Sequence, residues 1–271
     1  MLVTACRPVL DDTELILTKT RIVLVIEYDG TGYFGFQWQK GQATVQQEIE
    51  KAIFQLTGEK LRVTAASRTD TGVHAKGQVV SFRTLSTTPL KNIITGLNHY
   101  LPESIAVKYA FYPDDDFHVQ HSAVSRKYEY YILNSSTRSP FSQRFAYQVP
   151  GKLDIEKMQD ACLLLVGEHD FASFTSTDSV QLKNTIRRVE EAGFRKEKGL
   201  IVFTIKANSF LAHQVRNTIG ALLKIGKGMM STQEFYSIME QKKPGLAGPR
   251  APSCGLCLVR VNYLHPIEEE K

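Results

Sequence analysis

The sequence predicts an α+β protein of two related units that share one extended, mostly antiparallel sheet, with helices on one face. Short β-branched apolar runs, typical of buried strands, alternate with segments whose apolar residues recur at helical spacing. The order β-α-β-β-α-β occurs twice, with one extra helix in the second half. The chain has 271 residues, of which 42% are hydrophobic, so it is long enough for two units with a sizeable core.

The first unit is expected over residues 21–114, after an N-terminal tail at 1–20. Thr44 starts a capping-box pattern, so a helix is predicted from there to Gly58. Thr88-Pro89 opens a second helix, through about Leu97. The predicted strands of this unit are 21–28, 61–66, 78–83 and 105–112.

The second unit is expected over residues 115–265, with a tail at 266–271 and a seam at the acidic, turn-prone segment 113–116. Its helices are predicted over 154–166, ending at Gly167, over 209–224, and in a short segment capped by Ser231. Its predicted strands are 126–133, 185–194, 199–207 and 254–263.

The segment ASRTDTGVHA (66–75) places polar groups between two runs that otherwise indicate core. The turn-forming pair Thr71-Gly72 would hold Asp70 at an exposed loop apex. An aspartate that caps local backbone amides, with Arg68 as a surface neighbour, is one interpretation. Catalysis is the other, because a loop held by strands at both ends fixes geometry well. An aspartate near an arginine stays ionised at neutral pH, which suits a nucleophile or an electrostatic stabiliser.

His74 could act as a second acid-base group, but its apolar neighbours Val73 and Ala75 favour a packed structural histidine. The sequence lacks a Walker A loop, a G-x-S-x-G elbow and an H-E-x-x-H motif. Cys254 and Cys257 form a C-x-x-C, which allows a metal or redox site. Without a second cysteine pair, a buried strand is the preferred interpretation. Any chemistry would therefore depend on one aspartate, with no metal and no cofactor.

Charge and composition indicate which partners and which cellular compartment to expect. A formal net charge of +5 permits a polyanionic partner without requiring one. Four cysteines in a chain of this length do not indicate a disulfide framework. No apolar run has the length of a signal peptide or a membrane helix, so a cytoplasmic protein without membrane association is expected.

Six segments resemble those of one enzyme family, in the family's order, from Arg21 to about Tyr263. SRTDTGVHAKGQVVSF resembles the signature of the TruA-type tRNA pseudouridine synthases. The other matching segments are YDGTGYFGFQ, FHVQHSAVSRKYEYYIL, GEHDFASF, ANSFLAHQVRNTIG and APSCGLCLVRVNY.

The resemblance implies the pseudouridine synthase fold and a cofactor-free isomerase. Such enzymes convert uridine to pseudouridine at positions 38, 39 and 40 of the tRNA anticodon stem and loop. The base is detached at N1, turned and rejoined to the ribose through C5. The family also implies a homodimer in which one tRNA touches both subunits.

The resemblance assigns roles residue by residue. The catalytic aspartate falls on Asp70, which would attack the ribose or the base or remove a ribose proton. The tyrosine that stacks on the uridine falls on Tyr128, which by pattern alone is a half-buried sheet residue. The arginine that pairs with the aspartate falls on Arg216, by pattern alone a solvated helix charge. Arg68, inside the matching motif, is placed with Tyr128 and Arg216 among the substrate-binding residues.

Three residues depart from the family pattern: Ser67 replaces a glycine, Gln120 an arginine and Gln214 a methionine. These departures leave room for an RNA-binding module without catalysis. A hydrolase using Asp70 with His74 is a further alternative. Since none of the three departures affects Asp70, Tyr128 or Arg216, activity is the expectation.

Overall fold

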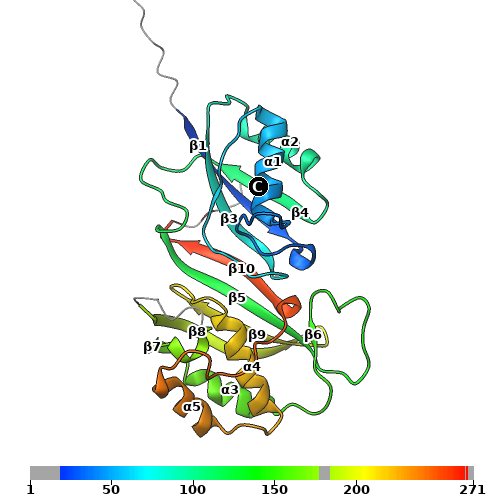
Figure 1. Ribbon diagram of the computed structural model, residues 1–271, viewed down its shortest axis with the longest axis vertical. Helices are drawn as coiled ribbons and strands as arrows, with labels where there is room; N and C mark the ends of the chain where they lie inside the picture. The colour runs from blue at the N-terminus through cyan, green and yellow to red at the C-terminus, as the bar shows by residue number, and fades with distance from the viewer. Residues whose placement is uncertain (1–18, 177–183, 266, 268–271) are drawn as a thin grey trace, which may run out of the picture.

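Ten strands form a single sheet in the computed structural model, which describes residues 19–176, 184–265 and 267 (Figure 1). The strand order is β4-β1-β3-β10-β5-β9-β8-β7, with β2 paired to β3 and β6 paired to β5. The pairings are antiparallel except β3 with β10 and β5 with β6. The strands are β1 Thr20–Tyr28, β2 Thr64–Ala65, β3 His74–Thr84, β4 Ile105–Phe111, β5 Ala123–Leu133, β6 Tyr147–Gln148, β7 Gly167–Asp170, β8 Ile186–Glu197, β9 Leu200–Ala207 and β10 Leu256–Tyr263.

The helices lie on one face of this sheet (Figure 1). The first two pack on each other and the second packs on β4, whereas the other three gather over the second half of the sheet, around β8. The opposite face carries charged side chains in cross-strand ion pairs such as Lys108–Glu27 and Arg195–Glu129. The helices are α1 Val45–Thr57, α2 Leu90–Tyr100, α3 Ile155–Leu163, α4 Gln214–Gly226 and α5 Thr232–Gln241, with short 3₁₀ turns at Gly30–Gly32, Ala172–Phe174 and Ser253–Gly255.

Two units of the same strand order share the sheet, as the sequence predicts. In the first unit β1 lies between β4 and β3, and in the second β5 lies between β10 and β9. In each case the first strand of the unit lies between the unit's last strand and the strand that precedes it in sequence. The units join where β10 pairs with β3 through Cys257–His74 and Leu258–Ala75. We propose that the boundary along the chain lies between residues 114 and 115.

The helix caps form as their residues predict. The Thr44 hydroxyl accepts a hydrogen bond from the Gln47 amide at 3.3 Å, and α1 ends at Gly58, whose φ of 75° is left-handed. At α5, Ser231 and Glu234 form a complete capping box. These local signals place the helix ends correctly.

The predicted start of α4 at Ser209 is wrong, because the helix begins at Gln214. The preceding residues find other hydrogen-bond partners. The Leu211 amide donates to Oε1 of Gln214 at 2.8 Å, and the Ala212 carbonyl accepts from the Thr175 hydroxyl at 3.1 Å. His213 then has a left-handed backbone, with φ 63°. Residues 209–213 are therefore an irregular segment that leads into the helix.

Other element boundaries also differ from prediction. The helix predicted to reach Val166 ends at Leu163. The edge strand β7 follows it, and the sequence does not predict this strand because GEHD is polar and shows no alternation of apolar and polar residues. Of the strand predicted over 61–66 only the two residues of β2 form a strand, because the side chains of Gln46 and Glu50 in α1 hydrogen-bond the backbone of Val63. The strand predicted from 78 begins at His74, and the one predicted from Cys254 begins at Leu256 after a 3₁₀ turn.

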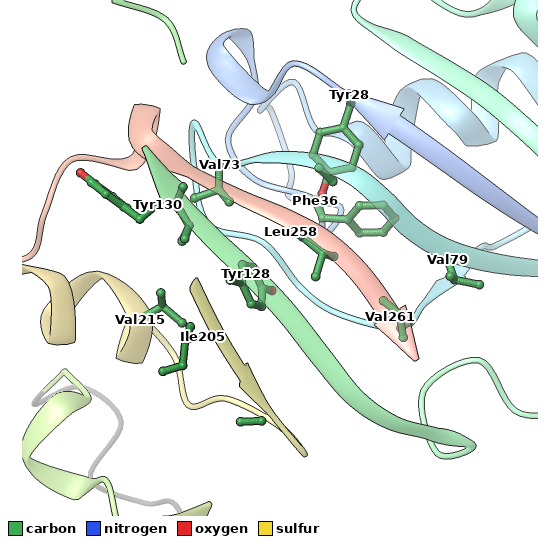
Figure 2. Close-up of a cluster of buried hydrophobic side chains, with 14 of the residues drawn as sticks. Tyr28, Phe36, Val73, Val79, Tyr128, Tyr130, Ile205, Val215, Leu258 and Val261 are labelled. Atoms are coloured by element: carbon green, nitrogen blue, oxygen red, sulfur yellow. The ribbon is translucent and has the colours of Figure 1, made fainter. Parts of the chain in front are cut away.

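One hydrophobic core runs through both units. Tyr128 of β5 lies directly between Leu258 of β10 and Ile205 of β9 in the sheet, with Val215 of α4 nearby (Figure 2). No helix within the described residues is long and apolar enough to cross a membrane. The N-terminal tail predicted at 1–20 falls almost wholly, and the tail at 266–271 largely, outside the described residues.

Candidate active site

A cavity of about 500 Å³ is lined by both units. The first unit contributes the loop between β2 and β3, and the second contributes β5 and the segment 209–216. The four residues predicted for the site all line it: Arg68, Asp70, Tyr128 and Arg216. The fold thus gathers groups that are up to 148 positions apart in the sequence.

The loop that carries Asp70 is held in place by the last residue of β1 and by the segment that follows it. The buried Thr69 hydroxyl bonds the Tyr28 hydroxyl at 2.8 Å, and the Thr69 carbonyl accepts from the Phe36 amide at 3.1 Å. Gly35 passes so close that a Cβ there would lie 2.7 Å from the same carbonyl. Gly72 supplies the left-handed turn, with φ 75°. Asp70 is consequently held on a rigid support.

Two donors from the start of α4 meet the carboxylate of Asp70. His213 Nδ1 lies 2.7 Å, and Arg216 Nη1 3.3 Å, from the same oxygen, Oδ2. Burial by itself would raise the pKa of Asp70, but the hydrogen bond from His213 and the charges of His213 and Arg216 outweigh it, so the pKa lies below the usual range. Asp70 is therefore an ionised carboxylate in a partly enclosed cavity at neutral pH.

Arg68 does not provide this stabilisation, contrary to what its position beside Asp70 in the sequence suggests. Arg68 is exposed and lines the cavity, whereas the guanidinium at Asp70 belongs to Arg216. Arg216 is itself anchored by donating Nε to the Ala251 carbonyl at 2.8 Å. The distant arginine, not the neighbouring one, pairs with the carboxylate.

Tyr128 presents its ring and hydroxyl toward the same cavity. Only 6% of the residue is exposed, its hydroxyl lies 2.9 Å from the Ser67 hydroxyl, and the Phe210 ring meets it edge-on at 5.2 Å. Burial raises the pKa of Tyr128 to about 12, so the phenol stays protonated. A flat aromatic group with a fixed polar end therefore borders the same cavity as Asp70.

The charge of the lining favours an anionic ligand. Among the described residues that line the cavity, Asp70 is the one carboxylate, beside the guanidinium groups of Arg68, Arg126 and Arg216. Arg126 also links separate segments around the cavity, because its guanidinium donates hydrogen bonds to the backbone carbonyls of Ala66, Gln120, Ala123 and Asn208. Arg126 is thus a structural support for the site that the sequence did not reveal.

His74 lies away from this cavity and is a structural histidine, as preferred from the sequence. Its Nδ1 accepts from the Gly30 amide at 3.0 Å and lies 3.2 Å from Asp29, while its ring packs against Phe145. Burial lowers the pKa of His74, so the ring is neutral at neutral pH. An acid-base pair of Asp70 with His74 has no support in this arrangement.

The C-x-x-C has no metal-site geometry. Cys257 is buried in β10 and Cys254 is partly buried in the preceding 3₁₀ turn. Across residues 19–176, 184–265 and 267, no group of three or more histidine, cysteine, aspartate or glutamate residues could hold a metal ion.

The three departures from the family pattern have distinct surroundings. Ser67 bonds Tyr128 and has no left-handed backbone, so this position does not require glycine. Gln214 is 1% exposed, and its Oε1 accepts a hydrogen bond from the Leu211 amide. Its Nε2 lacks a hydrogen-bond partner among the described residues. Gln120 is exposed and lines the cavity.

His213 is a second polar group at the site, beside Arg126, that the sequence did not reveal. A signal existed, because His213 stands three residues before Arg216 and so lies on the same side of the helix start.

The chain is similar to proteins of one enzyme family. The family model described as tRNA pseudouridine synthase matches residues 24–122 and 161–264. The chain is 39% identical to tRNA pseudouridine synthase A of Thermoanaerobacter sp. (strain X514) over 242 residues. It is 41% identical to the protein of that name from Acetivibrio thermocellus and 42% identical to that from Caldicellulosiruptor bescii. Each match covers 89% of this chain and 99% of the relative.

Proposed function

This chain belongs to the tRNA pseudouridine synthase family, and on that premise we propose that it isomerises uridine to pseudouridine at positions 38, 39 and 40 of the tRNA anticodon stem and loop, with Asp70 as the catalytic nucleophile. The observation that carries this proposal is the ionised Asp70 in a cavity whose other charged side chains are basic. A polyanion is attracted to such a cavity, and a carboxylate on a rigid loop can act on the nucleotide that enters it.

The reaction conserves the atoms of the nucleotide. Asp70 attacks C1′ of the ribose as the bond from C1′ to N1 breaks. The freed uracil turns, C5 bonds to C1′ and displaces the carboxylate, the proton on C5 leaves, and N1 takes up a proton. No oxidant or reductant is needed for this sequence of steps.

The other lining residues support these steps. The Tyr128 ring stacks on the uracil while it turns, since stacking tolerates rotation of the base. Arg216 keeps Asp70 ionised, and the exposed Arg68 meets the phosphates of the strand that carries the flipped nucleotide.

The lowered pKa of Asp70 favours nucleophilic attack over proton removal. A carboxylate that two donors stabilise is a weak base, but it remains an anion that can bond to an electron-poor carbon. Deuterium at C2′ should therefore leave the rate unchanged. A primary isotope effect at C2′ would show instead that Asp70 removes the ribose proton.

The setting follows from the family and is part of the same proposal. The partner is tRNA, with the anticodon stem and loop at the cavity. The protein acts in the cytoplasm as a homodimer, with one tRNA touching both subunits. Sedimentation with and without tRNA measures the stoichiometry, and a monomer that binds one tRNA would contradict the dimer.

The test is to incubate the protein with unmodified tRNA and to map pseudouridine by carbodiimide-dependent reverse-transcription stops. We expect stops at one or more of the three positions with the wild-type chain and none with Asp70→Ala or Asp70→Asn. Asp160→Asn, an exposed aspartate on α3, is the matched control and should behave as wild type.

The products separate this function from its rivals. Isomerisation leaves the RNA mass unchanged, hydrolysis releases a fragment, and binding alone leaves the base unaltered. Substantial turnover by Asp70→Ala would refute the role of Asp70, and bound but unmodified tRNA would indicate a binding module.

A further inference from the structure

The two donors at Asp70 are placed asymmetrically. His213 and Arg216 both contact Oδ2, at 2.7 and 3.3 Å, and no described residue donates a hydrogen bond to Oδ1. The contact with His213 is the shorter of the two. One carboxylate oxygen is thus tied to the protein, and the other is available to a ligand in the cavity.

The backbone of His213 is unusual for its position. Within the described residues the non-glycine residues with positive φ are Lys198, His213 and Lys242. Lys198 stands in the turn between β8 and β9, and Lys242 follows the end of α5, both common places for left-handed backbone. His213 instead precedes the first residue of α4, where an extended backbone is usual.

The side chain of His213 does not serve the helix either. A residue before a helix commonly accepts a hydrogen bond from a free amide of the first turn. His213 makes no such cap, and its ring nitrogen lies at Asp70 instead. Backbone strain combined with an unused capping position indicates a functional constraint at this residue.

We propose that His213 is a positioning residue: it donates Nδ1–H to Oδ2 of Asp70 and so turns Oδ1 toward the substrate. The left-handed backbone places the imidazole there. This inference rests on the proposed role of Asp70 and adds a group that fixes the orientation of its carboxylate. His213 acts through Asp70 and takes no part in bond breaking.

Three substitutions separate the backbone of His213 from its side chain. Asn tolerates left-handed backbone and keeps an N–H donor, so His213→Asn preserves both features. His213→Gly preserves the backbone and removes the donor, and His213→Ala removes the donor and adds strain. Lys242→Gly is the matched control, because it makes the same backbone change outside the lining of the cavity.

The measurements are the single-turnover rate at saturating tRNA, the Kd for tRNA and the unfolding temperature. Loss of one hydrogen bond to a charged group should slow His213→Gly by about 10- to 100-fold. Its Kd and unfolding temperature should stay near wild type. His213→Asn should recover most of the rate, and Lys242→Gly should keep the wild-type rate.

Two results would overturn the inference. One is a wild-type rate in His213→Gly. The other is an equal loss of rate in His213→Gly and His213→Asn together with lowered unfolding temperatures, which would assign His213 a structural role. Failure of the proposed function would give a different result, because the wild-type chain itself would then form no pseudouridine.

Discussion

Replacing Arg216 with leucine removes one of the two donors at Asp70 and tests how the carboxylate is stabilised. At the observed 3.3 Å and an effective dielectric constant of about 20, the attraction between the two charges is about 5 kcal/mol. Water reaches the side chains of Arg216 and Asp70, which are 16% and 25% exposed. The hydrogen bond between His213 and Asp70 also remains in the variant. We therefore expect roughly half of this energy, about 2–3 kcal/mol, to appear in the barrier. The rate should fall by about 30- to 160-fold.

The pH dependence of Arg216→Leu has a defined sign. Burial, the largest influence on Asp70, raises its pKa, and the loss of Arg216 removes part of what opposes it. The carboxylate is then protonated at higher pH than in wild type, so the rate should start to fall at higher pH as the solution is acidified. In wild type the lowered pKa stabilises the fold above the ordinary carboxyl pKa, and this contribution is lost as pH falls through the folded-state value.

The assay is single-turnover pseudouridine formation from pH 8 down through the acid limb of the rate, with thermal unfolding measured in parallel. Arg216→Lys should restore the rate only partly, because an ammonium group cannot reproduce the planar fork that meets both Asp70 and the Ala251 carbonyl. Lys227→Leu, an exposed charge at the end of the same helix, is the control. A wild-type rate in Arg216→Leu, or an unchanged acid limb, would refute the reasoning.

Three further substitutions test the lining and its support. Gln120→Arg should tighten tRNA binding by about 1 kcal/mol and steepen the slope of log K against log salt by about one, with kcat unchanged. Parallel slopes in a salt titration would show that this position faces away from the RNA. Tyr128→Phe keeps the ring and loses the bond to Ser67, so we expect a rate within about tenfold of wild type and about 1 kcal/mol of lost stability. A rate loss as large as that of Asp70→Ala would instead give the hydroxyl a chemical role. Gly35→Ala should lower the free energy of unfolding by about 1–3 kcal/mol in denaturant titrations, because its φ is 88° and its Cβ would crowd Thr69, whereas unchanged stability would contradict this packing.

Much of the fold could be predicted from local patterns. Runs of β-branched and aromatic residues predict β1, β5 and β9, and apolar spacing with caps predicts α1 and α5, because each of these signals acts within a few residues. Local patterns do not predict an edge strand such as β7, because a short polar segment becomes a strand by pairing with its neighbour and not through its own residue pattern.

The sequence by itself determined the residue types of the site, because Arg68, Asp70, Tyr128 and Arg216 all stand in segments that resemble the family. The tertiary structure decided how they meet. Arg216, 146 positions from Asp70, is its charge partner, whereas the neighbouring Arg68 is an exposed residue of the cavity lining. His213 reaches Asp70 through a backbone conformation that no periodic pattern encodes. Periodicity reports which face of an element is buried, but contacts between distant elements depend on how those faces pack, which the folded chain alone settles.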